Sequence, residues 1–145
     1  MRYVFDTNVL VAALRSDRGA SRRLLLAALD RKIVTLASVP LMVEYEAVLL
    51  RDEHLAAAGI SAGDASTILD ALTGIVHPVW LRFHWRPRLK DPADEMVLEA
   101  AVNGRADRLV TFNLRHLREA SAEFGILAVT PPVASKEISD RHAKE

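Results

Sequence analysis

The chain contains no cysteine, and this absence excludes disulfide bonds, thiolate nucleophiles and thiolate-ligated metal sites. It also has no apolar run close to the roughly 20 residues that a membrane-spanning helix needs. The opening segment, MRYVFDTNVLVAAL, carries an Asp inside its apolar run and no plausible cleavage site, which argues against a signal peptide. From these absences we expect a cytoplasmic protein that makes no contact with a membrane.

The chain has no excess of charge of either sign, because 19 Lys and Arg residues balance 19 Asp and Glu residues. A protein that binds nucleic acid strongly and non-specifically is usually basic overall. Any contact with a polyanion must therefore come from a local basic patch, or from metal ions that bridge to phosphate. The length of 145 residues, half of them hydrophobic, fits one globular domain with its own core.

Apolar periodicity and turn signals predict strands that alternate with helices along the chain. The expected strands are residues 2–5, 33–37, 79–83, 109–111 and 126–129, and the expected helices are residues 9–14, 21–30, 41–50, 61–75 and 91–103. This alternation predicts an α/β fold, a three-layer α/β/α sandwich with a central, mainly parallel sheet of four to five strands. We assign residues 1–132 to this domain and residues 133–145 to a C-terminal tail of the same domain, either a short helix or a frayed end.

Ligands of open parallel sheets bind at the carboxyl ends of the strands. This rule directs attention to Asp6, to the residues that follow Ala37, and to Thr111 and Asn113. Taken alone, Asp6 is typical of a helix N-cap, and Thr111 and Asn113 are typical of a turn. The functional alternative is a carboxylate site in which Thr111 and Asn113 give polar support.

Further acidic residues occur at comparable places. Glu44 borders the apolar stripe of its helix, whereas Glu46 is turned too far around the helix axis to share that face. Asp91 and Asp94 lie in the first turn of the helix over 91–103, where acids also favour the positive end of the helix dipole. Because Asp94 is one turn ahead of Leu98, it borders the buried face, and a metal site would use Asp94 with help from Asp91.

Five segments follow one another in the order seen in one family: FDTNVL, VEYEAVL, KDPADEMVLEAA, LVTFNLRHL and FGILAVTPP. Over about residues 2–132 the chain resembles PIN-domain nucleases, in the branch of toxin components of bacterial toxin–antitoxin pairs related to VapC-type toxins. The resemblance implies a Mg²⁺- or Mn²⁺-dependent endoribonuclease that hydrolyses RNA phosphodiester bonds. Its implied partners are an RNA substrate, a cognate antitoxin and a second copy of the chain in a homodimer.

The resemblance also implies roles for individual residues. The catalytic residues would be Asp6, Glu44 and Asp94, the metal ligands Asp6, Glu44, Asp91 and Asp94, and the supporting residues Asn8, Thr111, Asn113 and His116. Many relatives carry an Asp where this chain has His116, so the site either has one carboxylate fewer or His116 faces solvent at the start of a helix. Carboxylates alone would repel a phosphodiester, and their expected task is to hold a hard cation that neutralises charge and acidifies water.

The densest basic stretch leads directly into Asp91. Its members Arg82, Trp85, Arg86, Arg88 and Lys90 are candidates for tracking an RNA backbone and stacking a base. The alternative is a solvated loop with Trp85 folded into the core. A second basic patch, Arg15, Arg18, Arg22 and Arg23, is either a solvated face or a surface for an acidic antitoxin segment.

Three other functions compete with the nuclease interpretation. A haloacid-dehalogenase-type phosphatase also carries an Asp at the end of its first strand, but it usually has a second Asp two residues on, where this chain has Asn8. A non-catalytic PIN-like module that binds RNA or a partner is favoured only by His116. A DNA flap nuclease of related fold would need an arch or insertion that the chain lacks.

Overall fold

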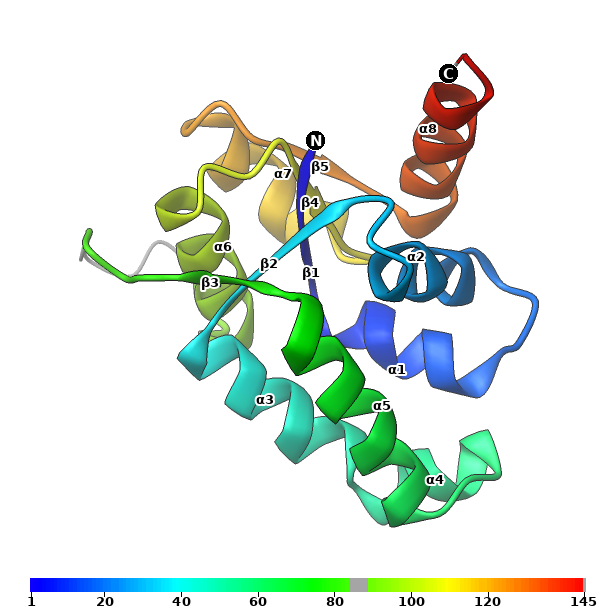
Figure 1. Ribbon diagram of the computed structural model, residues 1–145. Coiled ribbons are helices and arrows are strands. Elements are labelled where there is room, and N and C mark those ends of the chain that lie inside the picture. Colours follow the sequence, from blue (N-terminus) through cyan, green and yellow to red (C-terminus); the bar gives the residue numbers. More distant parts are fainter. Residues whose placement is uncertain (84–88, 145) are drawn as a thin grey trace.

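A computed structural model describes residues 1–83 and 89–144, which form one five-stranded sheet surrounded by helices (Figure 1). The strands are β1 (Arg2–Phe5), β2 (Val34–Ser38), β3 (His77–Val79), β4 (Arg108–Val110) and β5 (Leu127–Val129). All neighbouring strands pair in parallel, in the order β3-β2-β1-β4-β5. The predicted three-layer α/β/α architecture with a parallel central sheet is confirmed.

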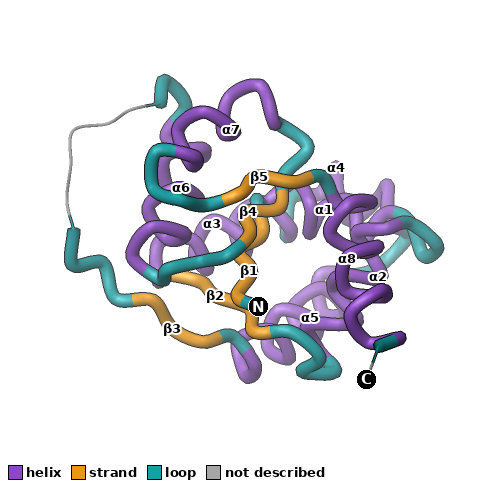
Figure 2. Tube along the Cα trace, turned by 90° about the horizontal axis from the view of Figure 1, so that it is seen from above, coloured by secondary structure: helices purple, strands orange, loops and turns teal. Residues whose placement is uncertain are grey.

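Eight helices cover this sheet in the described residues. They are α1 (Thr7–Arg15), α2 (Ala20–Leu29), α3 (Val39–Leu49), α4 (Asp52–Ala58), α5 (Ala62–Ile75), α6 (Pro92–Asn103), α7 (Leu114–Ala122) and α8 (Pro131–Ala143). Seen from above, α6 and α7 lie on one side of the sheet and α2 and α8 on the other (Figure 2). No helix in the described ranges is long and apolar enough to cross a lipid bilayer.

The helix starts that the sequence predicts are present. Ser38 accepts a hydrogen bond from the backbone N–H of Leu41, which leaves Pro40 in the first turn of α3. Ser61 and Asp64 form a reciprocal capping box at the start of α5. Asp91 caps α6 by accepting the N–H of Ala93. These local signals fix where α3 and α6, the helices that carry Glu44 and Asp94, begin.

The core is centred on the middle of the sheet. Tyr3, Val4 and Phe5 of β1 are essentially inaccessible to solvent, as are Leu36 of β2 and Leu109 of β4. Strands covered by helices on both faces lose the alternation of polar and apolar residues. This burial holds the carboxyl ends of β1 and β4 at fixed positions side by side.

The predicted strand over residues 79–83 is wrong, because β3 spans His77–Val79 and ends before Trp80. The side-chain oxygen of Asn103 accepts the backbone N–H groups of both Arg82 and Phe83, at 2.9 and 2.8 Å. These donors are therefore bonded to a helix end and are not available for pairing with a neighbouring strand. The apolar alternation was misleading because Phe83 is 64% exposed.

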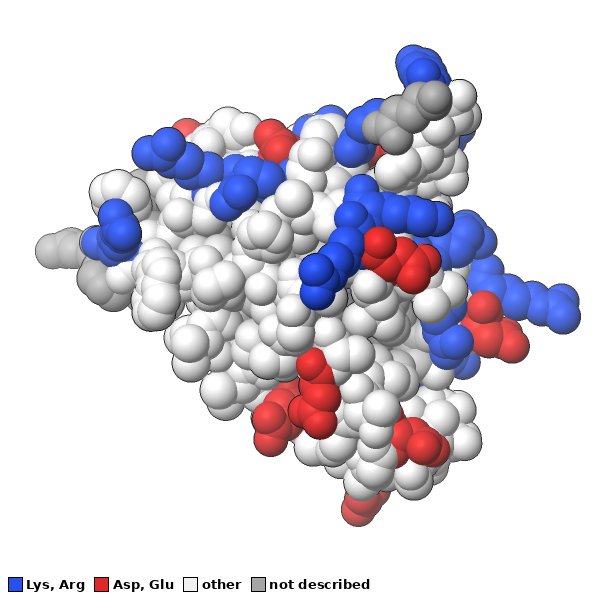
Figure 3. Space-filling view, viewed as in Figure 1, with Lys and Arg blue, Asp and Glu red and all other residues white. Residues whose placement is uncertain are grey.

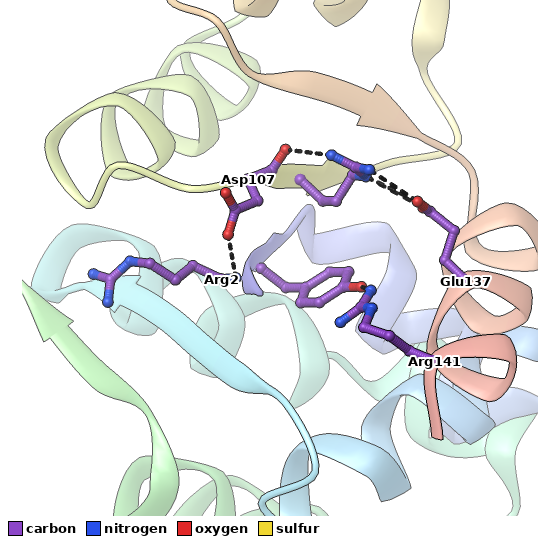
Figure 4. A network of polar contacts seen from close by, with 6 residues as sticks. Arg2, Asp107, Glu137 and Arg141 are labelled. Carbon is purple, nitrogen blue, oxygen red and sulfur yellow. Dashed lines mark hydrogen bonds and ion pairs between the residues drawn. The ribbon is translucent and has the colours of Figure 1, made fainter. Parts of the chain in front are cut away.

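The last stretch of the chain, expected to be a short helix or a frayed tail, forms α8, which packs on α2 and buries Ala134 and Ile138. Polar contacts join this helix to the sheet (Figure 4). Arg108 of β4 makes a forked pair with Glu137, with its closest contact at 2.9 Å. Arg141 donates to the buried Tyr3 hydroxyl at 2.6 Å. These contacts attach α8 to β1 and β4.

The pair between Arg108 and Glu137 should contribute to stability. Both side chains are mostly shielded from solvent, at 20% and 29% exposure, and a bidentate pair holds better than an ordinary surface pair. We expect Glu137→Gln to lower the free energy of unfolding by about 1 kcal/mol, measured by urea denaturation. The control is Lys136→Met, which removes an exposed pair with Asp140 on the same helix and should change little. Equal losses in the two variants would contradict a specific clamp.

Candidate active site

Asp6 follows β1 and is only 5% exposed. It occupies the N-cap position of α1, yet its side chain makes no capping hydrogen bond. Instead, the hydroxyl of Thr111, which is fully buried after β4, donates to Asp6 Oδ2 at 2.7 Å. The simple reading of Asp6 as a helix cap therefore does not describe what its carboxylate contacts.

Thr111 is held in the donating orientation by its neighbour. The backbone N–H of Asn113 donates to Thr111 Oγ1 at 2.9 Å, so the hydroxyl proton is directed to Asp6. The side-chain amide of Asn113 in turn lies 3.5 Å from Asp94 Oδ2. The segment after β4 thus links the carboxylate after β1 with the carboxylate on α6.

Asp94 lies in the first turn of α6 and is 6% exposed. Besides Asn113, its Oδ2 has the ring Nδ1 of His116 at 3.4 Å. Asp91, one turn earlier and at the surface, caps the helix. The structure therefore brings together six of the predicted site residues: Asp6, Asp91, Asp94, Thr111, Asn113 and His116.

These carboxylates disturb one another. Burial raises the pKa of Asp6, and the nearby charges of Asp94 and Asp91 raise it further. Burial also raises the pKa of Asp94 and Asp91 adds to that rise, while the contacts with His116 and Asn113 lower it in part. Carboxyl groups that are poorly solvated and close to like charges have an unmet demand for positive charge.

Glu44 is less closely joined to this group. It lies on α3, half-buried, next to Tyr45, whose hydroxyl donates to the backbone oxygen of Phe5 just before Asp6. This hydrogen bond shows that α3 reaches the end of β1, and burial and the charge of Asp6 both raise the pKa of Tyr45. Within the described ranges the Glu44 side chain makes no hydrogen bond or ion pair, and Glu46 faces solvent.

Some of the predicted supporting and RNA-binding residues lie apart from the acids, and others lie outside the residues that the structure describes. Asn8 is exposed and lines a different depression with Arg15 and His54. Arg82 and Lys90 are both exposed, and Lys90 borders the acids. Trp85, Arg86 and Arg88 lie outside the described residues.

A pocket of about 250 Å³ opens beside the acids, lined by Leu89, Lys90, Asp91, Asp94 and His116. Phe112 is 53% exposed and stands between Thr111 and Asn113, which both face the acids. Phe112 is not among the site residues predicted from the sequence. Alternation along the extended segment after β4 was the signal that could have identified it, since a residue between two inward polar residues points outward.

The donor set suits a hard divalent cation, which prefers carboxylate, hydroxyl and water oxygens. Thr7, the residue after Asp6, buries its hydroxyl oxygen with no hydrogen-bond partner among the described residues. Within residues 1–83 and 89–144, however, no three Asp, Glu or His side chains already converge on one ion position. Asp6 and Asp94 therefore fit a cation by chemistry, while the remaining positions would fall to water and substrate.

Comparison with known families agrees with this geometry. A family model described as PIN domain matches residues 2–115, a range that contains β1, α3, α6 and the start of α7 with the candidate site acids Asp6, Glu44, Asp91 and Asp94. Among curated proteins, none matches the chain.

Proposed function

Because the chain belongs to the PIN-domain family, whose members are generally divalent-metal-dependent nucleases, we propose that it is an endoribonuclease that hydrolyses RNA with Mg²⁺ or Mn²⁺. The observation that carries the proposal is the linked group at the carboxyl edge of the sheet. Asp6, Thr111, Asn113 and Asp94 are joined there by hydrogen bonds across three elements. Two buried carboxylates that lie close to further negative charge are expected in a site that binds a cation.

In this proposal Asp6 and Asp94 hold the ion, with Asp91 and Glu44 as further ligands from the rims. The bound ion supplies positive charge against the phosphate and acidifies water. Thr111 keeps the Asp6 carboxylate in one orientation, because its hydroxyl donates to Asp6 while it accepts the backbone N–H of Asn113. A carboxylate oxygen left without a ligand role can accept the proton of the attacking water.

RNA would reach the acids through the pocket beside α6. Lys90 on its wall offers a charge for a backbone phosphate, and the exposed ring of Phe112 offers a surface on which a base can stack. An unpaired base is needed for such stacking, so the proposed substrate is single-stranded RNA. A toxin role with a cognate antitoxin remains part of the proposal, supported by the resemblance of the five sequence segments.

The deciding experiment is a cleavage assay with the purified chain on a fluorescent single-stranded RNA, with the same DNA sequence as control. We expect endonucleolytic products with Mn²⁺ or Mg²⁺ and none after addition of EDTA. Full cleavage in EDTA would contradict a metal mechanism. RNA binding without cleavage under all metal conditions would favour the non-catalytic module. Growth of cells that express the chain with and without the neighbouring reading frame tests whether that frame encodes an antitoxin.

We also propose that the chain forms a homodimer through the apolar face of α3. Val39 and Val43 are 70% and 62% exposed, and they border a groove with Val76 and Pro78. Figure 3 shows a largely uncharged surface over β3, with acidic side chains over α3 and α5, where Glu46 and Asp70 line the groove. Exposed apolar patches of this kind commonly mark protein interfaces.

Sedimentation velocity at tens of micromolar (roughly the range in which a standard interface is occupied) should show a dimer. Val43→Lys should convert it to a monomer, because a charge would be buried in the interface. Val133→Lys, an exposed Val on α8, serves as the matched control and should leave the dimer intact. A wild-type monomer under these conditions would refute the association.

A further inference from the structure

His116, at the position where many relatives have Asp, is turned to the acidic group. It lies in the first turn of α7, and its ring Nδ1 is 2.8 Å from Asn113 Nδ2 and 3.4 Å from Asp94 Oδ2. Its side chain is 55% exposed and helps to line the pocket with Asp91 and Asp94. Of the two arrangements that the sequence left open, the structure has the one in which the imidazole faces the carboxylates.

The contact with Asn113 indicates which form of the ring is present. An amide nitrogen donates hydrogen bonds and does not accept them, so at 2.8 Å the imidazole Nδ1 must be the acceptor. In this neutral form the Nδ1 lone pair of His116 faces the Asn113 N–H, so an ion bound at Nδ1 would take the place of that hydrogen bond.

We propose that His116 Nδ1 is a metal ligand beside Asp94, and that it makes the site select Mn²⁺ over Mg²⁺. This inference rests on the proposed function. Two donors at right angles on an ion with bonds of about 2.1 Å are about 3 Å apart, close to the 3.4 Å that separates His116 Nδ1 from Asp94 Oδ2. The pair can therefore serve one ion as neighbouring ligands after a shift of a few tenths of an ångström.

The chemistry of the donor decides the selectivity. Mg²⁺ binds oxygen ligands and keeps its waters, and an imidazole gives it little. Mn²⁺ also favours oxygen ligands but, as a first-row transition metal, it accepts an imidazole nitrogen more readily than Mg²⁺ does. Exchanging a carboxylate for an imidazole also removes one negative charge from the site. This loss weakens the attraction for Mg²⁺, which gains little from a bond to the imidazole nitrogen.

The test measures metal binding directly. Mn²⁺ affinity is followed by electron paramagnetic resonance of free Mn²⁺, Mg²⁺ affinity by competition, and coordination by ¹⁴N modulation of the bound Mn²⁺ spin echo. We expect ¹⁴N modulation in the wild type and its loss in His116→Ala, with Mn²⁺ affinity falling about tenfold and Mg²⁺ affinity nearly unchanged. His116→Asp should raise Mg²⁺ affinity and remove the preference. His77→Ala, an exposed histidine on β3, should retain the wild-type signal.

The outcomes separate this inference from the proposed function. If bound Mn²⁺ lacks ¹⁴N modulation, or if His116→Ala leaves the ratio of Mn²⁺ to Mg²⁺ affinity unchanged, His116 is not a ligand, even when the enzyme cleaves RNA. If neither ion binds and no RNA is cleaved, the metal-dependent nuclease fails, and the role of His116 fails with it.

Discussion

Asp94→Asn and Asp6→Asn should each reduce RNA cleavage by at least about 100-fold, a loss of about 2.7 kcal/mol of transition-state stabilisation, while the protein stays folded. Each change keeps the shape of the side chain and removes the charge. In Asp6→Asn the amide can still accept the hydrogen bond from Thr111, so the link across β1 and β4 survives. What disappears is the carboxylate that would hold the cation. Initial rates at saturating Mn²⁺ measure the effect.

Two glutamates on α3 form a matched pair, in which Glu46 is the control and Glu44 is a predicted site residue. Glu46 is exposed and lines the groove next to Val43, away from the acids, so Glu46→Gln should cleave at close to the wild-type rate. Glu44 is half-buried beside Tyr45, and Glu44→Gln should lose activity. The opposite ranking, with Glu46 essential and Glu44 dispensable, would show that the assigned face of α3 is wrong. Near wild-type rates in Asp94→Asn would remove Asp94 from the site.

How much of this site could be predicted depended on how local each signal is. The starts of α3 and α6 are set by capping residues within one turn, and the sequence identified Ser38 and Asp91 correctly. Burial of Asp94 followed from its spacing to Leu98 on α6. These features depend on neighbours in the sequence, and a periodic pattern is enough to read them.

Contacts between distant segments could not be derived in this way. The hydrogen bond between Thr111 and Asp6 joins residues 105 positions apart, and it exists because β4 lies next to β1. Periodicity does not give the order of strands in the sheet. The rule about carboxyl ends therefore predicted that the site lies at that edge of the sheet, but not that Thr111 contacts Asp6. The direction of His116 was equally open, because one turn of slippage after Asn113 would re-aim its ring. The strand predicted over 79–83 does not form because the side chain of Asn103, about twenty residues away, accepts the N–H groups of Arg82 and Phe83.

The repulsion between the acids should also appear in the stability of the metal-free protein. Burial, aided by neighbouring carboxylates, raises the pKa of both Asp6 and Asp94 above the ordinary value of 3.8. A carboxyl group with a higher pKa in the folded state binds protons more tightly when folded. Its effect on stability is absent below 3.8, where both states are protonated, and becomes unfavourable as the pH rises through the raised pKa.

We therefore expect Asp6→Asn and Asp94→Asn to melt at higher temperature than the wild type at neutral pH, with each kcal/mol worth roughly 3–5 °C in a domain of this size. The gain should shrink as the pH falls through the window above 3.8, because protonation then relieves the wild type in the same way. Calorimetry in EDTA across this range measures the difference between variant and wild type, and Glu46→Gln controls for the loss of one charge. Saturating Mn²⁺ should reverse the ranking at neutral pH, since the ion binds and stabilises only a folded site with its carboxylates intact. A difference that is largest in acid and vanishes at neutral pH would mean that Asp6 and Asp94 are stabilised as carboxylates by the fold itself, with no demand for a cation.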